Sequence, residues 1–187
     1  LDAGASFVDL YEEETRNAAV SLRDHKIETA TAGIEYGVGL RLLFGTDVVY
    51  GYTGSDSEDD LRILLNALLA ARADAKSPAR PGFPAFKIAH APRMQEILRL
   101  PAEAGQAAKL PLQMRAEKAG YALSPAVAQV SASLADSTKK ITIANSEGLF
   151  VSDERTRTRF SVSVTAENSA GERFVAGEDS GFAEGEG

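Results

Sequence analysis

The stretch that decides the fold is KKITIANSEGLFVSDERTRTRFSVSVTAE, which runs from Lys139 to Glu167. It holds two runs with strand-like composition, separated by a polar break that contains Asn, Ser and Gly. In the second run, three arginines alternate with residues of smaller or apolar type. Successive residues of a strand point to opposite faces, so one face of this ribbon is expected to pack on a core. The other face is expected to meet water or a partner.

Two roles remain open for Arg155, Arg157 and Arg159, which point the same way on a strand. They could bind an acidic peptide or a phosphate, because guanidinium groups form paired hydrogen bonds with both. They could equally pair with Asp or Glu on neighbouring strands, which a chain of net charge −7 can supply. We favour the second role. On the opposite face we expect Phe160, Val162 and Val164 to point into the core.

The N-terminal part shows the same two-residue period. We expect a strand over residues 7–16 and a hairpin whose turn is Asp24-His25, two residue types that tolerate positive φ. The clearest strand is EYGVGLRLLF, and the chain is expected to return over residues 48–53. The side chains predicted for its buried face are Tyr36, Val38, Leu40, Leu42 and Phe44.

The middle of the chain changes period. Ser57 is expected to cap a helix that ends near Asp74 and carries a stripe of leucines, namely Leu61, Leu64, Leu65 and Leu68. A Pro-rich extended arm is expected near residues 77–92. A second helical region should follow between Pro92 and about Tyr121, interrupted at Pro101 and Pro111.

Strands are expected again after Pro125. The segments AVAQVSASLAD and KKITIANSEG are predicted to be neighbours in an antiparallel pair. The composition turns to Gly, Glu and Ala beyond Arg173, which favours a mobile end. The sequence therefore predicts an α+β fold, a largely antiparallel β-sheet packed with a few helices, in one domain over residues 1–175. Residues 176–187 are expected to form a flexible Gly/Glu-rich linker.

Composition excludes several classes of protein. The chain has 187 residues, no cysteine and a net charge of −7. Disulfides and thiolate metal sites are therefore excluded, and a reducing cytoplasm is the expected compartment. The acidic balance opposes nucleic-acid binding, and no apolar run approaches the roughly 20 residues of a membrane span. We expect neither nucleic acid nor membrane as a direct partner.

A search for catalytic residues yields none. His25 and His90 have no histidine three or four residues away, so no helical metal pair exists, and His25 is expected to be a solvated turn residue. Gly37-Val38-Gly39 lacks the spacing of a dinucleotide site and is expected to mark a bulge or close backbone approach. The run 12–14 of three glutamates is expected to be a charged edge. We therefore assign no catalytic, no cofactor-binding and no metal-binding residue to this chain.

Residues 141–167 resemble the N-terminal domain of the TldD/PmbA family, bacterial and archaeal proteins also called modulators of DNA gyrase. The resemblance rests on the NS-G turn and on the Arg-rich alternating strand after it. Residues 8–55 agree in order, with an acidic-aromatic strand, a LRDHKIE hairpin, the GVGLRLL strand and an aromatic-Gly-aromatic return. The family often has Gly where this hairpin has His25. The resemblance covers nearly the whole chain and is more TldD-like than PmbA-like.

The resemblance implies a zinc metallopeptidase that processes or degrades unfolded or leader-bearing peptides. In the family, a His-Glu-x-x-x-His helix and a later Cys hold the zinc in TldD-type chains, and PmbA-type (TldE) partners lack them. None of these residues is present here, so none is carried over. We expect this chain to be the N-terminal domain of a longer protein, with no zinc of its own and a catalytic C-terminal domain beyond Gly187.

The implied partners are that catalytic domain, a homologous TldD/PmbA subunit in a homo- or heterodimer, and an unfolded peptide. Two alternatives stay open. The parent could be a PmbA-type subunit that shapes the substrate channel without binding metal, or the chain could be a peptide-binding, regulatory or assembly module. A His-Glu-x-x-x-His motif downstream of Gly187 would distinguish a TldD-type peptidase from these two alternatives.

Overall fold

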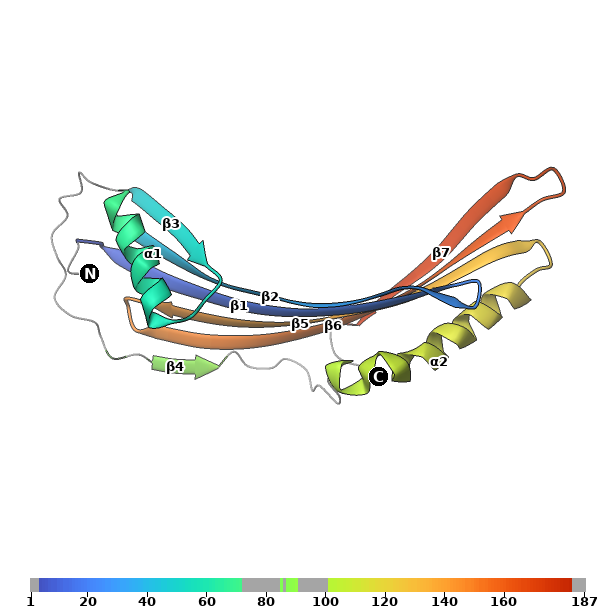
Figure 1. Ribbon diagram of the computed structural model, residues 1–187, viewed down its shortest axis with the longest axis horizontal. Coiled ribbons are helices and arrows are strands. Elements are labelled where there is room, and N and C mark those ends of the chain that lie inside the picture. The colour runs from blue at the N-terminus through green and yellow to red at the C-terminus, as the bar shows by residue number, and fades with distance from the viewer. Residues whose placement is uncertain (1–3, 72–84, 86, 91–100, 183–187) are drawn as a thin grey trace. The chain divides into compact units, whose positions relative to one another are not determined.

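The computed structural model describes residues 4–71, 85, 87–90 and 101–182. These residues form one sheet with two helices, and the predicted α+β class is confirmed. The strands are hydrogen-bonded in the order β3-β2-β1-β5-β6-β4, and β7 also pairs with β6 (Figure 1). The elements are β1 (Phe7–Arg23), β2 (Lys26–Phe44), β3 (Asp47–Thr53), α1 (Glu58–Ala70), β4 (Lys87–His90), α2 (Pro101–Ala122), β5 (Val127–Asn145), β6 (Leu149–Glu167) and β7 (Arg173–Phe182).

The described residues divide into two compact units, and four long strands contribute to both. Unit 1 comprises Leu1–Thr15, Glu35–Arg93 and Lys139–Glu154. Unit 2 comprises Arg16–Ile34, Met94–Thr138 and Arg155–Gly187. The segment predicted as a single domain therefore holds two separately packed cores, because each helix covers its own part of the strands.

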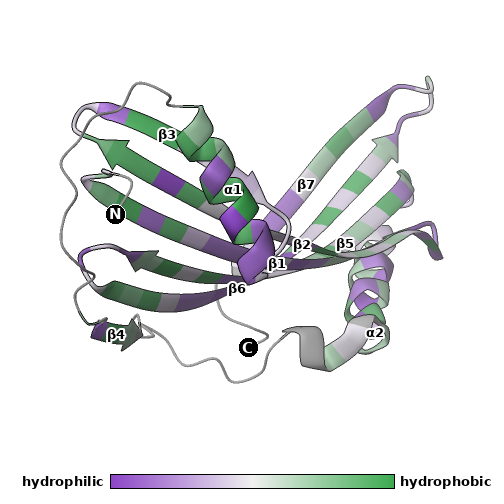
Figure 2. Cartoon of the chain, turned by 60° about the vertical axis from the view of Figure 1, so that its left-hand side comes forward, coloured by the Kyte–Doolittle hydropathy of each residue, from purple (hydrophilic) through white to green (hydrophobic). Residues whose placement is uncertain are grey.

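The core of unit 1 lies between α1 and one face of β2 and β3 (Figure 1). Its most buried side chains include Leu40, Leu42, Phe44 and Leu68, with Leu64, Leu65 and Leu69 packed against them. The predicted buried face of β2 is thus confirmed for these residues. Burial of each such side chain stabilises the fold by about 1.5–3 kcal/mol. In Figure 2, β3 is purple at its start and then green, the colour of hydrophobic residues, beside the end of β2.

Helix α1 begins where the sequence predicts. Ser57 is the N-cap, and its side chain accepts a hydrogen bond from the backbone N–H of Asp60. Three acidic residues in the first turn complement the positive end of the helix dipole. The helix ends at Ala70, and Asp74, its predicted end, lies outside the described residues.

In unit 2, α2 packs on β1 and β5 through a polar stripe with a spacing of four. Lys109 pairs with Asp136, the Gln113 amide donates to the carbonyl oxygens of Val20 and Ala132, and Glu117 accepts hydrogen bonds from His25. The approach is close at the end of α2, where a Cβ added to Gly120 would lie 2.8 Å from Val130 Cγ1. The stripe anchors α2 at three successive turns.

Three sequence predictions are wrong. The single strand β5 contains most of both AVAQVSASLAD and KKITIANSEG, which were predicted to be two neighbouring strands. The chain does not turn at Asp136, because this carboxylate is buried within the strand, where it pairs with Lys109 and accepts a hydrogen bond from Thr158. The helix does not stop at Pro111; the backbone leaves helical geometry at Gly105, with φ of 64°. The contacts of Lys109 and Gln113 with the sheet hold α2 on both sides of Pro111.

The third error concerns the end of the chain. Arg173–Phe182 are not mobile but form β7, antiparallel to β6 with Arg173 opposite Glu167 and Phe182 opposite Thr158. Residues 176–182 of the predicted linker therefore belong to the sheet, and residues 183–187 lie outside the described part. Glycine suits the close pairing at Gly177, where an added Cβ would lie 3.2 Å from the Val162 carbonyl oxygen.

Other predictions are confirmed. Asp24 and His25 both have positive φ, 50° and 65°, as the hairpin turn requires. Gly148 has φ of 91° at the turn before β6. Most of the Pro-rich arm near residues 77–92 lies outside the described residues, but Lys87–His90 are extended and run parallel to Leu149–Ser152 of β6.

Candidate functional site

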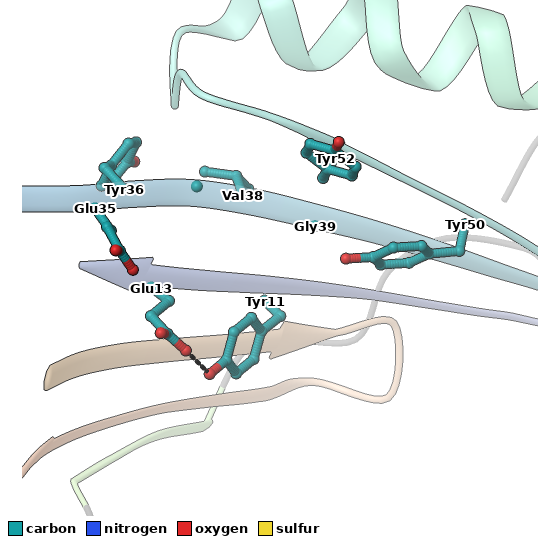
Figure 3. A pocket seen from close by; sticks show the side chains of 9 residues that line it. Tyr11, Glu13, Glu35, Tyr36, Val38, Gly39, Tyr50 and Tyr52 are labelled. Carbon is teal, nitrogen blue, oxygen red and sulfur yellow. Dashed lines mark hydrogen bonds between the residues drawn. The ribbon is translucent and has the colours of Figure 1, made fainter. Parts of the chain in front are cut away.

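A groove of about 230 Å³ lies on unit 1, on the sheet face opposite α1 (Figure 3). Residues from three adjacent strands line it, and aromatic and acidic side chains predominate. The lining residues are Tyr11 and Glu13 of β1, Glu35, Tyr36, Gly37, Val38 and Gly39 of β2, and Tyr50 and Tyr52 of β3.

On this face β2 carries two glycines: Gly37 leaves space open, and Gly39 leaves room for the ring of Tyr50. Gly39 pairs with Tyr52 in the register of β2 and β3. A Cβ added to Gly39 would lie 2.9 Å from Tyr50 Oη and 3.1 Å from Tyr50 Cε2, closer than real Cβ contacts. The sequence predicted a bulge or close backbone approach at Gly37-Val38-Gly39, whereas the group that comes close at Gly39 is the side-chain ring of Tyr50.

Tyr50 and Tyr52 are exposed because successive side chains of β3 point to opposite faces of the sheet. Val49 and Gly51 face α1, so Tyr50 and Tyr52 face the opposite side. Tyr50 is 61% exposed, Tyr52 77% and Tyr11 38%. Such a group of exposed rings is uncommon on a sheet face that meets only water, and it is typical of a surface that binds another molecule.

Two carboxylates of the groove differ in their surroundings. Glu13 accepts hydrogen bonds from Tyr11 and Thr15 and pairs with Lys139 at 2.7 Å. The hydrogen bond from Lys139, followed by that from Tyr11, lowers the pKa of Glu13 to about 2, so this carboxylate is ionised at neutral pH. Glu35 is exposed and has no hydrogen bond or ion pair among the described residues.

The three consecutive glutamates do not form a site. Glu12 accepts a hydrogen bond from the Tyr36 hydroxyl at 3.0 Å, on the side of the strand away from Glu13. Burial, and then this hydrogen bond to Glu12, raises the pKa of Tyr36 to about 12. Tyr36 therefore keeps its proton, and in Figure 3 it and Glu35 project to opposite sides of β2.

The arginine ribbon of β6 lies in unit 2 and alternates as predicted. Arg155, Arg157 and Arg159 are exposed, whereas Thr156 and Thr158 between them are buried. The favoured structural role is confirmed for Arg159, which pairs with Asp179 of β7. Hydrogen bonding to Asp179 raises the pKa of this guanidinium.

The expected core residues of the ribbon, Phe160, Val162 and Val164, are only half-buried. Arg157 makes no hydrogen bond or ion pair within the described residues. Together with Arg159 and Asp136 it lines a second groove of about 330 Å³ in unit 2.

His25 is exposed, as predicted, but it also takes part in a contact that the sequence did not indicate. Its side chain is 72% exposed, while Glu117, which is 1% exposed, lies 2.9 Å from its Nδ1 and accepts its backbone N–H at 2.7 Å. The Tyr121 ring lies 5.2 Å from the His25 ring. These contacts join the β1–β2 turn to α2, and His90 ends β4.

No group of three or more His, Cys, Asp or Glu side chains that could hold a metal ion occurs among the residues the structure describes. Neither helix in the described part of the chain is long and apolar enough to cross a membrane.

Two family matches cover most of the sequence. Residues 8–75 match PmbA/TldA metallopeptidase domain 1, and residues 99–186 match the PmbA/TldA metallopeptidase central domain. The groove therefore lies within the first match, and α2, β7 and the arginine ribbon lie within the second. No curated protein matches the chain.

Solved structures share the fold. A protein described as a modulator of DNA gyrase from Bacteroides thetaiotaomicron superposes with a TM-score of 0.76 at 13% identity, over 97% of this chain and 42% of its own. A second protein so described, from Thermotoga maritima, gives 0.74 at 14% identity, over 95% and 40%. TldE from Thermococcus kodakarensis gives 0.69 at 11% identity, over 96% and 40%. The chain thus spans about two fifths of the length of these relatives.

Proposed function

Because the chain belongs to the PmbA/TldD metallopeptidase family, we propose that it is the non-catalytic part of a peptidase that holds unfolded or leader-bearing peptides for cleavage. We place the catalytic residues outside these 187 residues, in a further domain of the same polypeptide. A homologous subunit is the proposed partner. We place the action in the cytoplasm, where the absence of cysteine from the sequence fits a reducing compartment.

Zinc is the metal expected for such a peptidase, and the residues present here do not fit a zinc site. Zinc is held by sets of three or four Cys, His or acidic ligands. The sequence has no cysteine and two histidines, and the described residues hold no such set. His25 meets one carboxylate, that of Glu117. No chemical step is therefore assigned to this chain, and its proposed task is binding.

The observation that carries the proposal is the exposed tyrosine-lined face of unit 1, next to an edge strand. Within the described sheet, β3 pairs with β2 alone, so its outer backbone groups are available to a further strand. An unfolded peptide that adds to such an edge gains backbone hydrogen bonds whatever its side chains. The rings of Tyr50 and Tyr52 then offer apolar contact area on the same strand. This arrangement suits a protein that accepts many unfolded sequences.

The test compares unfolded with folded polypeptide as ligand of the 187-residue chain. We expect a reduced and carboxymethylated protein to bind, its native disulfide-bonded form not to bind, and neither to be cleaved when zinc is added. Equal binding of both forms, no binding of either, or cleavage by this chain with one zinc per molecule would contradict the proposal.

A further inference from the structure

We propose that the tyrosine-lined groove is a subsite for one lysine or arginine side chain of an extended peptide. This inference rests on the proposed function, in which an unfolded peptide is the ligand. It adds a chemical preference that sequence-tolerant backbone pairing cannot supply. The preference follows from the size, the charge and the aromatic lining of the groove.

The size of the groove fits a single side chain. Its volume of about 230 Å³ is below the range of about 300–1,000 Å³ in which cofactors and drug-sized ligands bind. The groove is open, and β2 contributes no side chain to it at Gly37, where an added Cβ would have only the Thr53 carbonyl oxygen, at 3.6 Å, within 4 Å. A peptide lying along this face could therefore insert one long side chain beside the tyrosine rings without disturbing the sheet.

The charges of this face leave one negative charge unmatched. Arg41 pairs with Asp9, and Lys139 pairs with Glu13. Glu35 remains as a carboxylate without a partner among the described residues. In Figure 3 it projects from β2 on the side of Glu13 and Tyr11. A cation of the ligand is the complement of this group.

The aromatic lining favours a cation over a neutral side chain. A Lys or Arg head group within about 6 Å of a tyrosine ring is attracted by the electrons of the ring. Tyr50 and Tyr52 present exposed rings, and neither hydroxyl has a partner among the described residues. The aliphatic stem of the same side chain can cover ring surface while its head reaches Glu35.

The experiment measures binding of labelled twelve-residue peptides of Ala, Ser and Thr with a single central Lys, Arg, Gln or Glu. Fluorescence anisotropy with the 187-residue chain at low salt gives the affinities. We expect the Lys and Arg peptides to bind about two- to fivefold more tightly than the Gln peptide, the effect of one exposed cation–aromatic contact. The Glu peptide should bind more weakly than the Gln peptide, and added salt should reduce the differences.

Three variants of the chain test which residues cause the preference for Lys and Arg peptides. Glu35→Gln should remove most of the difference between the Lys and Gln peptides. Tyr52→Ala should weaken the Lys peptide more than the Gln peptide. Glu147→Gln, which alters an exposed carboxylate of the β5–β6 turn, is the matched control and should change nothing. Melting curves that match wild type show that each variant is folded.

Three results would overturn the subsite. They are equal binding of the Lys and Gln peptides by wild type, a Lys preference that survives Glu35→Gln, and a dimer of the chain that Tyr52→Ala dissociates. The last result would assign the groove to a second copy of this chain. Failure of the proposed function gives a different pattern, in which no peptide and no unfolded protein binds at all.

Discussion

Replacing Asp136 with alanine removes the ion-pair partner shown for the buried Lys109. Lys109 and Asp136 form an ion pair between α2 and β5, with side chains 4% and 9% exposed. The second carboxylate oxygen of Asp136 accepts a hydrogen bond from Thr158 at 2.8 Å. Asp136→Ala therefore leaves a buried ammonium without this counter-charge, a change that costs about 3–5 kcal/mol.

A double variant tests whether the cost comes from the buried charge of Lys109. In Lys109→Met with Asp136→Val, both charges are gone and side chains of similar shape fill the space. Such replacements are neutral or stabilising by about 1–4 kcal/mol. The Thr158 hydroxyl loses its acceptor, which costs about 1–3 kcal/mol. We expect the double variant to lie within about 2 kcal/mol of wild type and well above Asp136→Ala.

Urea unfolding followed by circular dichroism provides the assay, with the free energy taken from midpoints at a common slope. Asp179→Ala is the control, because it breaks the solvent-exposed pair with Arg159, and it should shift the midpoint far less than Asp136→Ala. A cost of Asp136→Ala no larger than that of this control would contradict the role of the buried pair. A double variant less stable than Asp136→Ala would contradict it as well.

Three further predictions concern unit 1 and the ribbon. Leu68→Ala should lower the free energy of unfolding by about 2–5 kcal/mol. Ile63→Ala, on the exposed side of α1, should change it by less than about 0.5 kcal/mol. Equal melting temperatures of these two variants would show that Leu68 is not in the core. The pKa of Glu13 is lowered to about 2 by Lys139, so the stability that it contributes is present above its ordinary value near 4.5 and lost as pH falls toward 2. The melting difference between wild type and Glu13→Gln should therefore shrink from pH 6 to pH 2.5, and a constant difference would argue against the pairing. Arg157→Glu should cost less than about 1 kcal/mol because the side chain is exposed, and a larger loss in thermal melts would mean that the faces of β6 are reversed.

The features that sequence alone predicted are those with a local signal. The alternation from Tyr36 to Phe44 predicts the buried face of β2, because a period of two fixes which residues share a face. Ser57 and the acidic turn after it predict the start of α1. Asp24-His25 predicts a hairpin turn, and both residues have the positive φ that this requires.

The features that it missed depend on contacts between distant residues. Asp136 is 27 residues from Lys109 in the sequence. Without knowledge of that contact, a charged residue between two strand-like runs indicates the end of a strand. The polar stripe of α2 has no apolar periodicity to mark its sheet side, because its buried residues are Lys109, Gln113 and Glu117. Strand β7 is stabilised by its partner β6, and its own composition favours a mobile segment.

The tyrosine-lined groove could be predicted only in part. The two glycines of β2 indicated a bulge or close backbone approach, not the approach of a tyrosine ring. Alternation on β3 places Tyr50 and Tyr52 on one face, yet only the register with β2 brings them beside Gly39. Tyr11 comes from a third strand. A site assembled from three strands follows from pairing, which one sequence does not specify.

We propose that the exposed face of unit 1 holds unfolded polypeptide at the edge strand β3. Hydrogen–deuterium exchange with and without a reduced, carboxymethylated protein tests this binding most directly. We expect slower exchange of the β3 amides when the unfolded protein is bound, with α1 unchanged and with the effect lost in the double variant Tyr50→Ala, Tyr52→Ala. Protection confined to α1 or α2, or unchanged exchange of β3 at saturating ligand, would contradict it.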